Sequence, residues 1–154
     1  INIKEIIKDV IQLANPRFEE QNTNSKINVV LSLEDDTETF GVKSDIHEMI
    51  LNLVLNTADA MPSGGNLEIS ARKMGGHIEI IVKDNGSGMS KEVYTHCMQP
   101  FFTTKGAKGT GIGLTMVNST VINHNGTIEI ESAPGVGTTF KIILPISIGV
   151  STDS

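Results

Sequence analysis

The sequence has little that would cross-link it, anchor it in a membrane or attract it to nucleic acid. Its 154 residues include one cysteine, Cys97, which excludes a disulfide framework and a cysteine metal cluster and favours a reducing compartment. No apolar run approaches the roughly 20 residues of a membrane span. The net charge is −6, whereas a nucleic-acid partner usually requires a basic face. A nucleotide stays compatible with this charge, because a few backbone amides and one divalent cation can hold phosphates.

Local patterns predict an alternation of helices and strands. Helical spacing of apolar residues covers 2–14, and Asn15 with Pro16 is expected to end that helix. A second helix is expected from a cap at Ser44 or Asp45 to about Met61, and a third over 112–123. Apolar residues alternate with polar ones, as in half-buried strands, over 27–33, 67–71, 77–84, 127–131 and 138–144.

These elements predict a two-layer α/β (α+β) sandwich. Hairpins imply a mixed, mostly antiparallel sheet of about five strands, covered on one face by about three helices. We expect one domain over 1–147, with 1–14 as a candidate stem helix, and a frayed tail over 148–154. Because the chain starts at Ile1 without a signal-peptide pattern, we interpret it as a fragment of a longer protein.

A polar stripe marks the second predicted helix. Glu48, Asn52, Asn56 and Asp59 share one face of it. A solvated face is the simplest explanation. Two asparagines one turn apart in mid-helix nevertheless favour a functional role, because asparagine is a mediocre helix former. Its amide oxygen can ligate Mg²⁺.

Three glycine-containing segments suit the approach of a ligand. Asp84 opens the sequence DNGSG, which is either a turn or an acceptor for the amine of a base beside flexible glycines. The sequence GTGIGL, at 109–114, opens a predicted helix. This segment is either a flexible loop before a capped helix or an anion site, with Lys105 and Lys108 upstream to add positive charge. It matches neither the dinucleotide fingerprint nor a P-loop. In the third segment, at 135–140, Thr138 is expected to face inward at the end of the sheet. The long segment over 85–109, with a short helix near 91–98, is typical of a lid or binding loop.

Taken in order, these segments resemble the GHKL superfamily of ATPases and kinases, whose ATP site is the Bergerat fold. The sequence NLVLNTADA (52–60) resembles the N box, DNGSG (84–88) the G1 box, PFFTTK (100–105) the F box, GTGIGL (109–114) the G2 box, and 135–140 the G3 box. The resemblance covers nearly the whole chain. The PFFTTK and GTGIGL pair points to sensor histidine kinases rather than to Hsp90, gyrase or MutL relatives.

The resemblance implies ATP and Mg²⁺ as cofactors. Asn56 would hold Mg²⁺ and Lys105 would lie in the lid near the phosphates, as the two catalytic residues. Asp84 would bind the adenine amine, and Thr138 would bind adenine directly or through water. The implied ATP-binding set is Asn52, Asn56, Asp59, Asp84, Gly86, Gly88, Met89, Phe101, Thr104, Lys105, Gly109, Thr110, Gly111, Ile112, Gly113, Leu114 and Thr138.

Two departures from the family pattern bear on the reaction. Hydrolysing members carry a glutamate base four residues before the Mg²⁺ asparagine, where this chain has Asn52, and an amide cannot take a proton from water. Many histidine kinases have a lysine three residues after that asparagine, where this chain has Asp59, so Lys105 or Lys108 would supply the charge. The first departure favours phosphoryl transfer over hydrolysis.

The resemblance therefore implies a protein-histidine kinase domain that donates the γ-phosphate of Mg-ATP to a histidine elsewhere. The implied partners are a histidine-bearing dimerisation domain of the same parent and a downstream response regulator. We expect a cytoplasmic domain without membrane contact, in a parent that can be membrane-bound. The alternatives are a GHKL protein-serine kinase or ATPase, and a degenerate module that binds nucleotide or only a partner.

Overall fold

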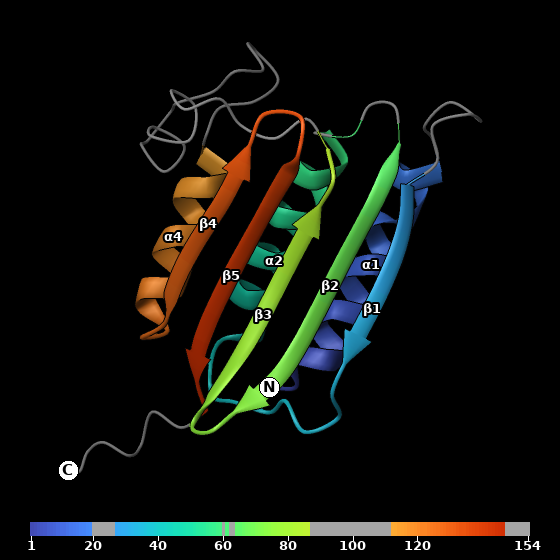
Figure 1. Ribbon diagram of the computed structural model, residues 1–154. Helices are drawn as coiled ribbons and strands as arrows, with labels where there is room; N and C mark the ends of the chain where they lie inside the picture. The colour runs from blue at the N-terminus through green and yellow to red at the C-terminus, as the bar shows by residue number, and fades with distance from the viewer. Residues whose placement is uncertain (20–26, 60, 62–63, 87–111, 147–154) are drawn as a thin grey trace, which may run out of the picture.

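The computed structural model describes residues 1–19, 27–59, 61, 64–86 and 112–146, and these form a sheet backed by helices (Figure 1). The elements follow the chain as α1 (Ile3–Glu19), β1 (Ile27–Leu33), α2 (Lys43–Asp59), β2 (Gly65–Met74), β3 (His77–Asp84), α4 (Ile112–Asn123), β4 (Thr127–Ala133) and β5 (Gly137–Pro145). The expected short helix near 91–98 lies outside the described residues.

The sheet has five strands in the order β1-β2-β3-β5-β4. β1 and β2 run parallel, whereas β2–β3, β3–β5 and β5–β4 are antiparallel. Within the described ranges, α1, α2 and α4 lie together on one face, with α2 between the other two (Figure 1). The predicted two-layer sandwich with a mixed, mostly antiparallel sheet is confirmed.

The core lies between the helices and the inner face of the sheet. The alternation in β2, β3 and β5 sends every second side chain inward, where apolar burial is the main stabilising term. α2 contributes an apolar stripe at helical spacing and packs against both neighbouring helices. The fully or almost fully buried side chains include Ile6, Ile7, Ile46, Ile50, Leu53, Leu67, Ile69, Ile78, Ile80, Phe140 and Ile142.

Among the described residues, the outer face of the sheet carries one buried charge. Glu79 of β3 is only 3% exposed, although it points away from the helices. Arg72 Nε lies 2.7 Å from its Oε1 on one side, and Lys141 Nζ lies 3.5 Å from its Oε2 on the other. The two cations, from the strands that flank β3, compensate the buried carboxylate.

The first helix is longer than predicted. The expectation that Asn15 and Pro16 end it is wrong, because α1 continues through Pro16 to Glu19. A proline in the last turn removes one hydrogen bond, to the carbonyl of Gln12. Gln12 is exposed, so water can satisfy that carbonyl. α1 packs into the domain through its apolar face, in which Ile3, Ile6, Ile7, Val10 and Ala14 are buried.

The second helix begins without the predicted side-chain cap. It starts at Lys43, and the Val42 carbonyl accepts the N–H groups of Asp45 and Ile46, so neither Ser44 nor Asp45 is the cap. The Val42 N–H donates to His124 Nε2 at 3.1 Å. His124 Nδ1 lies 2.8 Å from the Thr120 carbonyl, which fixes the ring. A tertiary contact from the end of α4 therefore holds Val42, the residue that directly precedes α2.

β1 is less buried than its alternation predicts. Ile27 is buried, but Val29 and Leu33 are half-buried and Leu31 is 38% exposed. β1 is an edge strand and pairs with β2 alone among the described strands. An edge position leaves one side of the strand uncovered, so alternation overestimates its burial.

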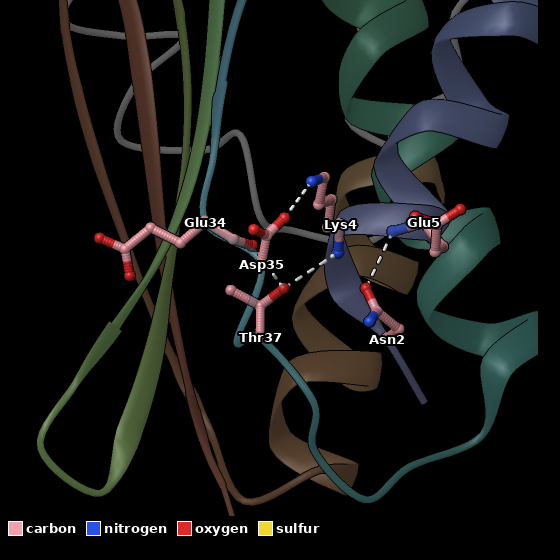
Figure 2. Close-up of polar contacts among 6 residues, drawn as sticks. All are labelled: Asn2, Lys4, Glu5, Glu34, Asp35 and Thr37. Carbon is pink, nitrogen blue, oxygen red and sulfur yellow. Dashed lines mark hydrogen bonds and ion pairs between the residues drawn. The ribbon is translucent and has the colours of Figure 1, made fainter.

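The N-terminal end of α1 is fastened to the segment after β1 (Figure 2). Asn2 Oδ1 accepts the Glu5 N–H at 3.0 Å, which caps the helix. The buried Thr37 hydroxyl accepts the Lys4 N–H at 3.2 Å and donates to the Glu34 carbonyl at 3.3 Å. Lys4 Nζ also pairs with Asp35 at the exposed rim. Thr37 is thus the buried link between helix and segment.

We expect Thr37→Val to lower the free energy of unfolding by about 1–2 kcal/mol, because the isosteric side chain leaves two part-buried backbone groups without their partner. Urea unfolding monitored by circular dichroism measures the loss. Thr127→Val, at an exposed position of β4, is the matched control and should change stability by a few tenths of a kcal/mol. Equal effects of the two substitutions would contradict the role of Thr37.

Candidate nucleotide-binding site

The predicted site residues that the structure describes gather at one end of the sandwich. There β3 ends, β5 begins, α2 ends and α4 begins (Figure 1, top). α4 presents its N-terminal end here. The first N–H groups of a helix have no partner within the helix itself, and with the helix dipole they favour an anion. The ends of the sheet and of two helices therefore surround one location.

Asp84, the last residue of β3, supplies a buried carboxylate. It is 4% exposed, and its Oδ1 accepts the Gly86 N–H at 2.8 Å. Its carboxylate also accepts the backbone N–H of Thr138. Burial raises the pKa of Asp84 above its ordinary value, while these two hydrogen bonds act in the opposite direction. A buried acceptor that costs stability when ionised is typical of a functional position.

Three polar residues form a row across the strands at this end. Asp84 pairs with Thr138 in the β3–β5 register, and Thr138 pairs with Ser132 in the β4–β5 register. The Thr138 and Ser132 hydroxyl oxygens lie 2.8 Å apart, and Thr138 is 5% exposed. Because register partners point to the same face, the three side chains share the inner face of the sheet. Asp84 and Thr138, both predicted to bind adenine, are therefore brought together, and Ser132 joins them.

Gly137 allows the β4–β5 turn to approach the end of β3. It has φ +128°, and a Cβ there would lie 2.1 Å from the Asp84 carbonyl oxygen and 2.9 Å from Asn85 Cα. Only glycine fits such a backbone conformation and such a contact. Asn85 is itself fixed, because its Oδ1 accepts the Asn66 N–H at 2.8 Å. The turn after β3 is thus held from both neighbouring strands.

The polar stripe of α2 reaches the same end of the molecule. Asn52 and Asn56 are half-buried one turn apart. Asn52 Nδ2 and Thr57 Oγ1 are buried atoms without a hydrogen-bond partner in the described part of the chain. Buried polar atoms are rarely left unpaired, so an orphaned donor beside Asn56 fits a bound polar group. Amide oxygens are also suitable neutral ligands for a Mg²⁺ ion that phosphates hold.

The remaining predicted site residues are described incompletely. Asp59 is the last residue of α2, and Ile112, Gly113 and Leu114 form the first turn of α4, with side chains outside the described set. The other predicted residues lie outside the described residues altogether: Gly88, Met89, Phe101, Thr104, Lys105, Gly109, Thr110 and Gly111.

Sequence reasoning did not select Ser132, Thr57 or Gly137 as site residues. The local sequence could have indicated Gly137, since it is the second glycine of a Gly-x-Gly turn directly before Thr138. Thr57 lay beside Asn56 but on the apolar side of the helix. Ser132 had no local signal, because only the strand register places it next to Thr138.

Residues 41–148 match the model of the histidine kinase-, DNA gyrase B-, and HSP90-like ATPase family. The chain belongs to this family. The match begins just before α2 and ends just after β5, so it contains the whole described end of the sandwich at which Asp84 and Thr138 meet. The resemblance to sensor histidine kinases is confirmed by the relatives within the family.

Two curated relatives of this ATPase-family chain are sensor or sporulation kinases. Sporulation kinase C of Bacillus subtilis is 33% identical over 149 residues, which cover 94% of this chain and 33% of the kinase. Sensor histidine kinase ZraS of Escherichia coli is 32% identical over 150 residues, covering 96% of this chain and 31% of ZraS. The chain thus spans about a third of the length of these relatives.

A solved histidine kinase domain has the same fold as this ATPase-family chain. The catalytic domain of histidine kinase ThkA superposes with a TM-score of 0.82 at 25% identity, over 96% of this chain and 94% of that domain. In the described ranges, none of the helices combines the length and the apolar character that a membrane crossing requires.

Proposed function

We propose that this chain is the nucleotide-binding catalytic domain of a sensor histidine kinase, and that it binds Mg-ATP where β3, β5, α2 and α4 meet. The observation that carries the proposal is the buried Asp84 carboxylate, which two backbone N–H groups from different segments hold at the end of the sheet. Family membership and the kinase relatives support an ATP ligand.

Asp84 is the group that we propose for recognition of adenine. Its two backbone bonds use part of its capacity as an acceptor, since an ionised carboxylate offers about four lone-pair sites. A remaining site can accept the exocyclic amine of adenine in a charge-assisted hydrogen bond. Guanine carries a carbonyl oxygen at that position, which the carboxylate would repel, so ATP should be preferred over GTP.

Asn56 and Asn52 are the residues that we propose to act at the phosphates. Asn56 would place its amide oxygen on Mg²⁺. Asn52 Nδ2, which has no hydrogen-bond partner among the described residues, would donate to a phosphate oxygen or to a water on the ion. A bound Mg²⁺ would neutralise charge on the β- and γ-phosphates. The start of α4 would add N–H donors, and Lys105 would add a positive charge from the segment over 87–111.

The reaction that we propose is transfer of the γ-phosphoryl group to an imidazole nitrogen of a histidine on another domain. The nitrogen forms a bond to the γ-phosphorus while the bond to the β,γ-bridging oxygen breaks, and ADP leaves. The protein contributes positioning and charge stabilisation. Asn52 disfavours the competing hydrolysis, because an amide cannot act as a general base toward water.

We propose the partners that this reaction requires: a histidine-bearing dimerisation domain of the same parent and a response regulator that receives the phosphoryl group. A cytoplasmic location is part of the proposal, because ATP is available there. The kinase relatives, of which this chain spans about a third, support a longer parent with further domains.

Calorimetric titration of the chain with ATP and GTP, each with and without Mg²⁺, tests the proposal. We expect ATP to bind more tightly than GTP, with Mg²⁺ strengthening ATP binding. Asn56→Ala removes the proposed Mg²⁺ ligand. In this variant the factor by which Mg²⁺ increases ATP affinity should be at least about tenfold smaller, which corresponds to roughly 1.4 kcal/mol. Asn28→Ala on the exposed edge strand β1 is the matched control and should retain it. Absence of ATP binding at millimolar nucleotide would overturn the proposal.

A further inference from the structure

Ser132 of β4 is a polar residue at the site that the proposed function does not use. It is half-buried on the edge strand, and its register partner is Thr138. Its Oγ lies 2.8 Å from Thr138 Oγ1 and 3.1 Å from the Gly137 carbonyl oxygen. Both neighbours belong to the segment that packs against Asp84.

The directions of these two hydrogen bonds follow from the number of protons. A serine hydroxyl carries one proton, and a carbonyl oxygen can only accept. Ser132 therefore donates to the Gly137 carbonyl. At the short contact between the two hydroxyls, Thr138 must then be the donor and Ser132 the acceptor. This leaves the Thr138 oxygen with lone pairs alone to offer to a ligand.

We propose that Ser132 is a positioning residue that sets purine specificity by holding the Thr138 hydroxyl as an acceptor. The inference rests on the proposed function, since it needs a purine at Asp84. With Thr138 fixed in this way, Asp84 and Thr138 present acceptors side by side on the inner face. Such a pair fits a purine that carries an amine at position 6, directly or through a water, and disfavours a purine with a carbonyl there.

The probe is inosine triphosphate, which replaces the adenine amine with a carbonyl and leaves the ribose and phosphates unchanged. Calorimetric titration with ATP and with inosine triphosphate gives a ratio of dissociation constants for each variant. In Ser132→Ala the Thr138 hydroxyl is released and can rotate to donate to the carbonyl. The preference for ATP should therefore fall by roughly threefold to tenfold, the range that one hydrogen bond produces.

Three further variants separate this role from a structural one. Ser132→Thr keeps a hydroxyl and should keep the preference for ATP. In a Thr138→Val background, Ser132→Ala should change the preference no further, because the hydroxyl that it positions is gone. Ser32→Ala on the exposed part of β1 is the matched control and should behave as the unaltered chain.

Each outcome decides between the possibilities. Equal weakening of both nucleotides by Ser132→Ala, with an unchanged preference, would overturn the inference while leaving the proposed function intact. A chain with serine at 132 that binds neither nucleotide would overturn the proposed function and the inference together. A lowered preference in Ser132→Ala that Ser132→Thr restores would support the positioning role.

Discussion

Replacing Gly137 with alanine is expected to lower the free energy of unfolding by about 3 kcal/mol or more and to abolish ATP binding. The new methyl group would lie 2.1 Å from the Asp84 carbonyl oxygen, so the backbone of one strand has to move. The φ of +128° is in addition unfavourable for any residue with a Cβ. Displacement of the β3 end would separate the Asp84 carboxylate from the Thr138 N–H. ATP binding is therefore expected to be lost together with folding stability.

Gly135 provides the matched control within the same turn. Its φ is +77°, but a Cβ there would meet no described atom within 4 Å. Gly135→Ala therefore adds backbone strain without a clash and should cost only about 1 kcal/mol. Urea unfolding gives both losses, and calorimetry at a temperature where the variants are folded gives ATP binding. Similar losses for the two alanine variants, or tight ATP binding by Gly137→Ala, would contradict the close approach.

The regular part of the fold was predictable because each element carries its own period. The alternation in β2, β3 and β5 fixed which side chains face the helices, and the apolar stripe of α2 fixed its buried face. These signals are local, and burial is the dominant force that they report. They therefore predicted a sheet covered by helices, which the structure confirms.

The element ends were less predictable, because tertiary contacts decide them. α2 begins at Lys43, before both predicted caps, and His124 at the far end of α4 holds the preceding residue by accepting the Val42 N–H. α1 passes through Pro16 because one exposed carbonyl can lose its partner at little cost. Neither effect is visible in a window of neighbouring residues.

In the candidate site, too, local signals identified some residues, whereas others depend on tertiary contacts. Asp84 and Thr138 could be selected from their places at strand ends and from the resemblance, but nothing local states that they are register partners. Strand pairing over more than fifty residues depends on how the whole sheet packs. For that reason Ser132 was not selected, although its hydroxyl lies within ordinary hydrogen-bond distance of the Thr138 hydroxyl, at 2.8 Å.

Asp84→Asn is expected to have opposite effects on ATP binding and on stability. Binding should weaken by about 1–3 kcal/mol, because the charge-assisted hydrogen bond to the adenine amine is lost. The unliganded chain should instead become more stable near neutral pH, because the variant no longer buries an ionised carboxylate. Calorimetry and urea unfolding of the same preparation measure the two effects.

The dependence on pH follows from the raised pKa of Asp84. The pKa of Asp84 is higher in the folded chain than in the unfolded chain. Over the pH window between these two pKa values, the folded chain therefore binds more protons than the unfolded chain. The contribution of Asp84 to stability therefore decreases as pH rises through that window. The advantage of Asp84→Asn over the unaltered chain should be largest above the window and should disappear below it.

ATP binding should show the reverse dependence, because the ionised carboxylate is the form that accepts the adenine amine. In the unaltered chain, affinity should decline on acidification at a higher pH than for an aspartate with an ordinary pKa. Asp9→Asn, on the exposed face of α1, removes the same charge and should change neither affinity nor the pH profile. If Asp84→Asn and Asp9→Asn gave the same profiles, net charge would explain the effect, and Asp84 would lose its place as the adenine acceptor.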